Sequence, residues 1–358
     1  MRTFVAPTFV APPVVAPAVA ALAIALLSAC VATAPPITYP VMPAALTPVD
    51  AEHNKSRDFA RIFCSTLAHL KDKNGRAWGD CAKYLETIES PQPQPPFTTP
   101  YRFMLVPGFG SECLKDVRAF STSIAHLKQA HQIPVEYFAI PPFGSSEANG
   151  KSIAKHIQES WNADKARRYV VIGYDKGAAD ILEALRILDA PKTAVAAVVT
   201  VAGIVGGVWL PEELRTLMQP SQPWIAPGCP GNVQDGVHSV LREVRQASLR
   251  QNPVQVAGYS IVASSSLDET SSPLRNSWKR LSLYAREQDG QNIAWESVLA
   301  GAKYLGSVRA DHWAIALPFE ESPQPPKAID HNHFPRDALL ESLVRFVSTD
   351  LAASETAK

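Results

Sequence analysis

An aspartate stands at the tip of a glycine-bracketed turn between a predicted strand and a predicted helix. The segment RYVVIGYDKGAADILEAL, residues 168–185, places Asp175 between Gly173 and Gly177. Such a turn strains the backbone of its middle residue, and its glycines are needed because side chains would not fit beside them. A carboxylate presented there can attack saturated carbon as a nucleophile or accept a proton from water as a general base.

Two side chains later in the chain are candidate partners for Asp175. Asp289 lies in REQDGQ, and His312 lies in RADHWAIALP. The order nucleophile, acid, histidine is typical of hydrolytic sites built on a parallel sheet. We therefore predict that Asp289 orients His312 and that His312 serves as the base.

Other acidic residues and histidines are weaker candidates. Glu287 and Asp268 compete for the role of the acid, whereas Asp311 should point away from the imidazole of the next residue. His331 and His333, in DHNH, indicate a metal pair only weakly, and a solvated loop is the better interpretation. No Cys/His spacing is typical of zinc, so we expect neither a metal nor a cofactor.

Backbone donors and aromatic residues complete the predicted site. VPGFG, residues 106–110, supplies a turn in which the N–H of Phe109 would join that of Lys176 as an oxyanion hole. The Lys176 side chain is expected to be exposed. A tryptophan is more often packed in a core than part of a site, but three aromatic side chains are candidates for the pocket wall: Tyr174, Trp209 and Trp313.

Strand and helix signals alternate through the part of the chain that must position these residues. Apolar runs without alternation, separated by helices, indicate a parallel sheet that is buried on both faces. A closing helix is expected from about 334 to 351, and the interval 208–255 interrupts the alternation and is long enough to form a lid. We predict strands within 102–110, 135–144, 168–174, 194–203, 279–290 and 304–313, and helices near 114–130 and 145–161.

Together, VPGFG, GYDKG, the DG loop and DHWA resemble an α/β-hydrolase over roughly residues 98–352. The motifs are most similar to secreted lipases and esterases. In those proteins the residue at the tip of this strand-turn-helix segment, which is called the elbow, is serine. The resemblance implies an α/β-hydrolase fold, a mostly parallel sheet flanked by helices, and a small-molecule or lipid ester as substrate. Asp175 is the departure from that family.

The predicted function is an exported hydrolase of the lipase/esterase type with Asp175, Asp289 and His312 at its site, and three accounts of what Asp175 does there are open. As a nucleophile it would resemble haloalkane dehalogenases and epoxide hydrolases, although Lys176 stands where those families usually have tryptophan and 208–255 contains no tyrosine. Alternatively, a natural or altered serine-to-aspartate change has silenced acyl transfer, and the domain only binds a ligand or partner; its carboxylate would then pair with His312. In the third account Asp175 is a general base for water.

The composition excludes some partners. Lys+Arg and Asp+Glu both number 34, so the formal net charge is zero and no basic excess is available to hold nucleic acid.

The N-terminus indicates export. An apolar core from about 18 to 27 is too short to span a bilayer and is typical of a signal peptide. LSAC, ending at Cys30, resembles the lipobox of bacterial lipoproteins, which implies a lipid anchor and a place in the cell envelope; an ordinary export signal is the alternative. The predicted division is a signal peptide 1–29, a Pro-rich tether 30–56, a helical hairpin 57–96 with Ser56 as N-cap, the hydrolase domain 97–352 and a tail 353–358.

Four cysteines follow Cys30 in this exported chain, an even set that predicts disulfides. Three connectivities are open. We favour Cys64–Cys81 because both residues lie in one short segment, and Cys113–Cys229 follows by elimination.

The lipobox makes a prediction about the mature N-terminus. We expect mass spectrometry of the mature protein to find a lipid-modified Cys30, and we expect Cys30→Ser to release the protein from membranes because acyl chains supply the anchor. An unmodified N-terminus at another residue would contradict the tether.

Overall fold

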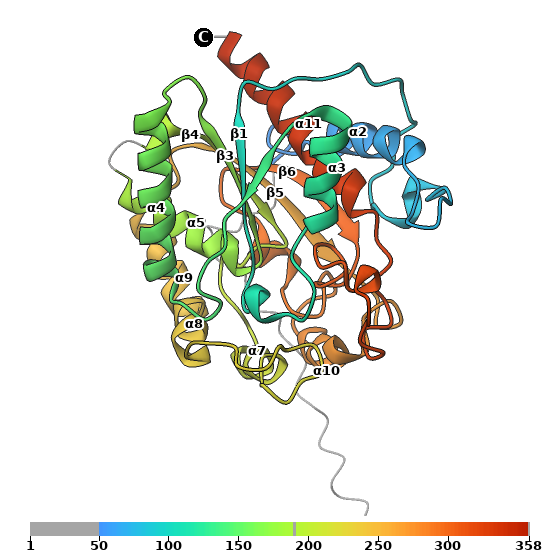
Figure 1. Cartoon of the computed structure of the whole chain (residues 1–358), viewed down its shortest axis with the longest axis vertical. Helices are drawn as coiled ribbons and strands as arrows, with labels where there is room; N and C mark the ends of the chain where they lie inside the picture. Colours follow the sequence, from blue (N-terminus) through green and yellow to red (C-terminus); the bar gives the residue numbers. More distant parts are fainter. Residues whose placement is uncertain (1–49, 189–190, 357–358) are drawn as a thin grey trace, which may run out of the picture. The chain divides into compact units, whose positions relative to one another are not determined.

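Six parallel strands form one sheet in the order β2-β1-β3-β4-β5-β6 (Figure 1). The strands are runs of apolar residues that become almost completely buried, as a sheet covered on both faces requires. The predicted fold class, a mostly parallel sheet flanked by helices, is therefore confirmed. The strands are β1 (Arg102–Val106), β2 (Val135–Tyr137), β3 (Tyr169–Tyr174), β4 (Val195–Val201), β5 (Ala257–Ser264) and β6 (Lys303–Arg309).

The computed structural model describes residues 50–188 and 191–356. The predicted signal peptide, Cys30 and most of the predicted tether lie outside the described residues. Within the described ranges, no helix is both long and apolar enough to cross a membrane.

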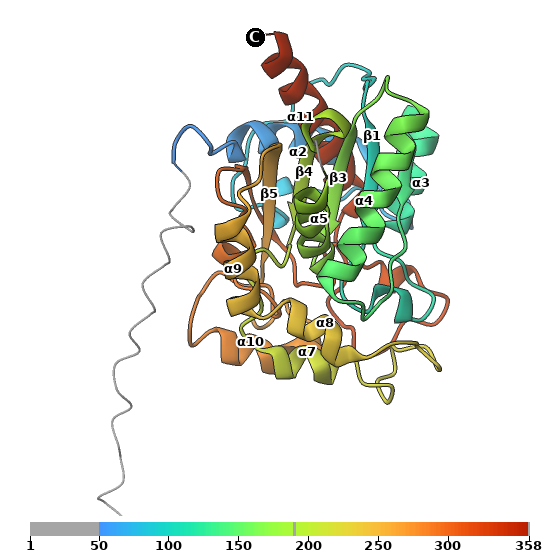
Figure 2. The same cartoon turned by 90° about the vertical axis from the view of Figure 1, so that its left-hand side faces the viewer.

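Helices cover both faces of the sheet, each over its own apolar core (Figures 1 and 2). On one face Phe59 packs edge-on against Phe346, with ring centroids 6.1 Å apart. On the other face Ile153 and Ile181 are fully buried. The first face carries α2 (Ser56–His69), α3 (Ser121–His131) and α11 (Arg336–Thr356), and the second carries α4 (Ser146–Ala163) and α5 (Lys176–Ile187).

The predicted lid interval folds into short helices. Figure 2 shows α7 and α8 beside α10 at the end of the sheet where β3 runs into α5. The interval contains α7 (Pro211–Leu217), α8 (Val233–Ser239) and α9 (Arg242–Gln251); α6 (Pro191–Ala194) precedes it, and α10 (Arg275–Leu281) follows β5. Within the described residues, 3₁₀ turns span Cys81–Lys83, Ser111–Cys113, Ser272–Leu274, Ala294–Ser297 and Phe319–Glu321.

One predicted strand is wrong. Residues 279–290 contain the end of α10 and a loop, in which Leu283 and Tyr284 are 51% and 39% exposed. The fifth strand is AGYSIVAS, residues 257–264, whose β-branched core pairs with β4 and β6. The acidic loop still reaches the end of this strand because the Ser265 N–H donates to the Gln288 carbonyl at 3.0 Å.

The segment before β1 differs from a helical hairpin. The first predicted helix is α2, but its N-cap is Lys55 and no side chain caps it; Ser56 instead donates to Asn54 Oδ1. The second predicted helix is only the 3₁₀ turn at Cys81. His53 and Lys55, expected in the tether, hydrogen bond to the Tyr304 backbone and cover the exposed edge of β6.

Both predicted disulfides are confirmed. Cys64 is joined to Cys81 and Cys113 to Cys229, with Cα atoms 5.3 and 5.4 Å apart. The second bridge ties the lid interval to the turn after β1.

The two bridges should differ in their contribution to stability. A cross-link stabilises by restricting the unfolded chain, so Cys64→Ala/Cys81→Ala, with a separation of 17 residues, should lower the free energy of unfolding by about 3 kcal/mol. Cys113→Ala/Cys229→Ala, with a separation of 116 residues, should cost about 5 kcal/mol. Urea unfolding measures both, and wild-type protein unfolded under reducing conditions is the control. Equal and negligible losses would contradict the role of the bridges.

Candidate active site

Asp175 lies where β3 ends and α5 begins, and its backbone is strained. Its φ of 51° and ψ of −124° are unfavourable for a residue with a Cβ atom. The neighbouring glycines permit the turn: a Cβ at Gly173 would lie 2.6 Å from the Ala178 backbone, and one at Gly177 would collide with the Val106 carbonyl. The sequence thus builds the predicted elbow with an aspartate at its tip.

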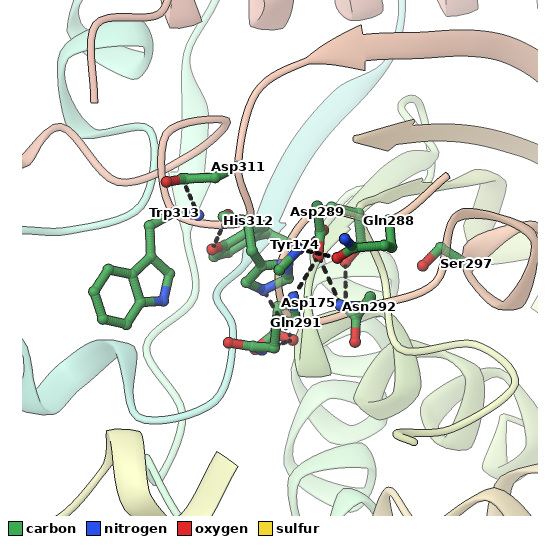
Figure 3. Close-up of polar contacts among 12 residues, drawn as sticks. Tyr174, Asp175, Gln288, Asp289, Gln291, Asn292, Ser297, Asp311, His312 and Trp313 are labelled. Carbon is green, nitrogen blue, oxygen red and sulfur yellow. Dashed lines mark hydrogen bonds and ion pairs between the residues drawn. The ribbon is translucent and has the colours of Figure 1, made fainter. Parts of the chain in front are cut away.

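Asp289 and His312 form a doubly connected pair (Figure 3). His312 Nδ1 lies 2.7 Å from Asp289 Oδ2, and the His312 N–H donates to the Asp289 carbonyl at 2.8 Å. The other oxygen, Oδ1, accepts the backbone N–H groups of Gln291 and Asn292 at 2.9 and 2.6 Å. The carboxylate is thereby fixed in orientation, and it fixes the imidazole in turn.

The alternative acids do not occupy this position. Asp268 and Glu287 are exposed. Asp311, as expected, turns away from the imidazole: its Oδ1 accepts from the N–H groups of Trp313 and Ala314.

The Asp175 carboxylate is held on both oxygens. Oδ2 accepts the Phe109 N–H at 2.7 Å. Oδ1 accepts from Gln291 Nε2 at 3.2 Å and lies 3.3 Å from His312 Nε2. Gly108 makes this approach possible, since a Cβ there would lie 2.6 Å from Asp175 Oδ2. With only 3% of its surface exposed, Asp175 fills the position that the predicted oxyanion would take.

The environment of His312 favours the charged form of its imidazole. Burial alone would lower the pKa of the imidazole, but the Asp289 carboxylate, joined by that of Asp175, raises it from 6.5 to about 10. An imidazolium at neutral pH cannot accept a proton, so His312 is not a base while both carboxylates are charged.

Tyr174 supports His312 and is not a pocket wall. Its hydroxyl donates to the His312 carbonyl at 2.8 Å, and its ring stacks on the imidazole with centroids 5.3 Å apart. Phe120 in turn contacts the Tyr174 ring edge-on.

The two tryptophans predicted for the pocket are packed elsewhere. Trp313 is 2% exposed and contacts Trp224 of the lid interval, with centroids 5.2 Å apart, so the lid is anchored through it. Trp209 lies under the Arg242 guanidinium, 4.0 Å from the ring centroid, and donates to Glu296 at 3.1 Å. The Asp175 carboxylate forms its hydrogen bonds and its ion pair with Phe109, Gln291 and His312, and with neither tryptophan.

The expectation that the Lys176 side chain is exposed is wrong. It is 1% exposed and pairs with Asp180 one turn later in α5, Nζ to Oδ1 at 2.6 Å. Asn149 of α4 donates to the second Asp180 oxygen at 2.8 Å. The ion pair lies within α5, and the hydrogen bond from Asn149 connects it to α4, directly behind the elbow.

Gln291 is the site residue that the sequence analysis missed. Its side-chain amide reaches Asp175, while its Oε1 is buried without a hydrogen-bond partner. Its position two residues after Asp289 was the available sign that it lies near the site, but a glutamine in a loop belongs to no sequence motif that would predict this contact.

Two groups of histidines bear on metal binding. His331 and His333 are substantially exposed, as expected for a surface loop. Their ring nitrogens lie 3.9 and 3.8 Å from different acidic residues, Asp330 and Glu320, and His333 also stacks on Trp78. A second group was missed: His126 and His131 meet Glu341 far from the elbow. Such a group is invisible in sequence because 215 residues separate His126 from Glu341.

Comparison with known proteins identifies the fold. A carboxyl esterase of metagenomic origin matches with a TM-score of 0.72 and 27% sequence identity, over 87% of this chain and 97% of that chain. The chain therefore has the α/β-hydrolase fold.

Other solved structures match more weakly. A Bacillus licheniformis lipase in its mature form gives a TM-score of 0.47 and 17% identity over 62% of this chain and 87% of its own. A type II thioesterase of the yersiniabactin pathway gives 0.39 and 13% over 72% and 97%. No family model matches the sequence, and no curated protein does.

The charge on His312 predicts a pH dependence of stability. Its pKa is higher in the folded protein, about 10 against 6.5, so its contribution is complete below pH 6.5 and is lost as the pH rises toward 10. Urea unfolding across this range measures the loss. Asp175→Asn removes one of the two carboxylates and should move the loss to lower pH; identical profiles for the two proteins would contradict this.

Proposed function

We propose that this protein is a carboxylic-ester hydrolase in its scaffold and in the layout of its site, and that Asp175 silences acyl transfer. The observation that carries the proposal is the hydrogen bond from the Phe109 N–H to Asp175 Oδ2. The predicted oxyanion donor is occupied by the protein's own carboxylate.

Acyl transfer needs three things that this arrangement withholds. A hydroxyl must attack the carbonyl, a neutral imidazole must take its proton, and an empty oxyanion hole must receive the developing charge. In this site Asp175 offers no hydroxyl, the raised pKa of His312 favours the imidazolium, and the proposed oxyanion donor, the Phe109 N–H, already donates to a carboxylate. A carboxylate attacking an ester would also form an anhydride, a product no more stable than the ester itself.

The likeness to a carboxyl esterase supports a small-molecule or lipid ester as the ligand class. Two contacts support this layout: His312 Nδ1 lies 2.7 Å from Asp289, and the Tyr174 ring stacks on the imidazole. The Lys176 N–H is the proposed second donor of the oxyanion hole.

We also propose that the protein is exported and anchored to a membrane through lipid on Cys30. Two disulfides support this placement, since such bonds persist in oxidising compartments.

A second candidate function is hydrolysis through an alkyl-enzyme ester. The different surroundings of the two Asp175 oxygens favour this function. Oδ2 accepts a hydrogen bond from the Phe109 N–H, while Oδ1 lies beside His312. If Oδ1 formed a bond to saturated carbon, a halide or the epoxide oxygen would depart with the electron pair of the broken bond. The carboxylate would lose its charge and the pKa of His312 would fall, so its proton would pass to the epoxide oxygen or, beside a halide, to solvent. The neutral imidazole would then activate water against the ester.

The groups that such chemistry uses in haloalkane dehalogenases and epoxide hydrolases are missing from this sequence. Lys176 stands in place of the tryptophan, and residues 208–255 contain no tyrosine. For this reason the silenced esterase is the preferred function.

Replacing Asp175 by serine tests the preferred function. Asp175→Ser should empty the oxyanion hole, lower the pKa of His312 and supply the missing hydroxyl. We expect hydrolysis of p-nitrophenyl butyrate to rise by roughly 10³-fold or more over the parent, as expected for restoring a member of such a triad. Asp175→Ser/His312→Gln is the matched control and should be inactive, and Asp175→Asn should stay silent. A parent as active as the serine variant would overturn the proposal.

Isotope labelling tests the second candidate. The parent would be incubated with a haloalkane or an epoxide in H₂¹⁸O, and the peptide containing Asp175 examined by mass spectrometry. An alkyl-enzyme ester hydrolysed at its carbonyl leaves ¹⁸O in the Asp175 carboxylate, whereas a silent site leaves none. Incorporation together with turnover would replace the preferred function by this one.

A further inference from the structure

Two imidazoles and a carboxylate converge between α3 and α11. His126 Nε2 lies 2.8 Å and His131 Nε2 3.0 Å from the same oxygen, Oε2 of Glu341. The three atoms lie within 4.8 Å of one another. His131 Nε2 is buried and has no partner with hydrogen-bond geometry, although the carboxylate is adjacent. Two nitrogens that point at one oxygen, one of them without a hydrogen bond, are placed as ligands of a common ion would be.

The surroundings fix the carboxylate in this orientation. Arg345 Nε donates to the other oxygen, Oε1 of Glu341, at 2.7 Å, which leaves Oε2 to the imidazoles. Arg345 is itself held by the Pro95 carbonyl at 3.0 Å and lies over the Phe97 ring, 4.1 Å from its centroid. The same ring packs on His131, with centroids 5.3 Å apart. Partners of this kind are what orient a ligating carboxylate in metal sites.

We propose that His126, His131 and Glu341 bind a zinc ion. Zinc takes imidazole nitrogen and carboxylate oxygen at about 2.0–2.2 Å in tetrahedral geometry, which separates two ligand atoms by roughly 3.3 Å. The observed separations of 2.8 and 3.0 Å require each imidazole nitrogen to move only a few tenths of an ångström away from the carboxylate oxygen. The two nitrogens, which lie within 4.8 Å of each other, would settle at about the same ligand separation. Both imidazoles are 19% exposed, so water can reach the fourth position and the ion can enter.

The role of the ion is structural. The cluster adjoins Pro95 and Phe97, which precede β1, whereas Asp175 follows β3 at its carboxyl end. The ion would join the end of α3 to α11, next to the hydrogen bond from Ser123 to Asp337 at 2.8 Å that links the same two helices. No residue of the elbow takes part, so this inference stands or falls separately from the proposed function.

Calorimetric titration of the full-length mature chain, carrying no histidine tag, with ZnCl₂ tests the site. We expect one zinc ion per chain and a rise in Tm on binding, with no response to MgCl₂, because magnesium prefers an all-oxygen shell. Glu341→Gln and His126→Gln/His131→Gln should each weaken binding at least about 100-fold.

His331→Gln/His333→Gln is the matched control, since it removes two exposed histidines and should leave binding unchanged. Circular dichroism checks that each variant is folded. His126→Gln alone serves where the double variant is not folded, and it should weaken zinc binding as well. The proposal is overturned if the wild-type chain binds no zinc stoichiometrically, if Glu341→Gln binds as the wild type does, or if binding is lost only in the control.

Discussion

The hydrogen bond between the Phe109 N–H and the Asp175 carboxylate connects the two ends of the candidate site. It requires the strained backbone at residue 175, the absence of a side chain at Gly108, and the close approach of the turns after β1 and β3. Since parallel neighbours in the sheet place those turns side by side, the contact follows from the topology. A carboxylate is thus fixed against the backbone donor at Phe109, and the rest of the site is arranged around it.

The main adjustment is electrostatic. His312 lies between two buried carboxylates, which raise the pKa of the imidazole above its ordinary value despite the cost of burying a charge. The group is stabilised in the form that cannot act as a base. A site with one carboxylate fewer would hold a neutral imidazole more easily, so a single side chain at the elbow changes both the nucleophile and the state of the base.

Much of the molecule stabilises this arrangement from a distance. The Lys176–Asp180 pair fixes the start of α5, the Trp224–Trp313 contact anchors the lid interval beside the histidine loop, and Cys113–Cys229 ties that interval to the turn after β1. On the far side of the sheet, α3 and α11 meet at a cluster of histidine, glutamate and arginine side chains.

The sequence by itself determined the parallel sheet, the elbow with its glycines, and the order of Asp175, Asp289 and His312, because these depend on local pattern or on chain order. It favoured the pairing of the cysteines that the structure shows, but it left three connectivities open. It misplaced the fifth strand, since the alternating apolar residues of 281–285 imitate a strand while Leu283 and Tyr284 face solvent. Only the tertiary structure decided that Tyr174 braces His312, that Lys176 is buried, that Gln291 reaches Asp175, and that His126 meets Glu341. Each of these is a contact between side chains on separate elements or a matter of burial, and neither depends on neighbours along the chain.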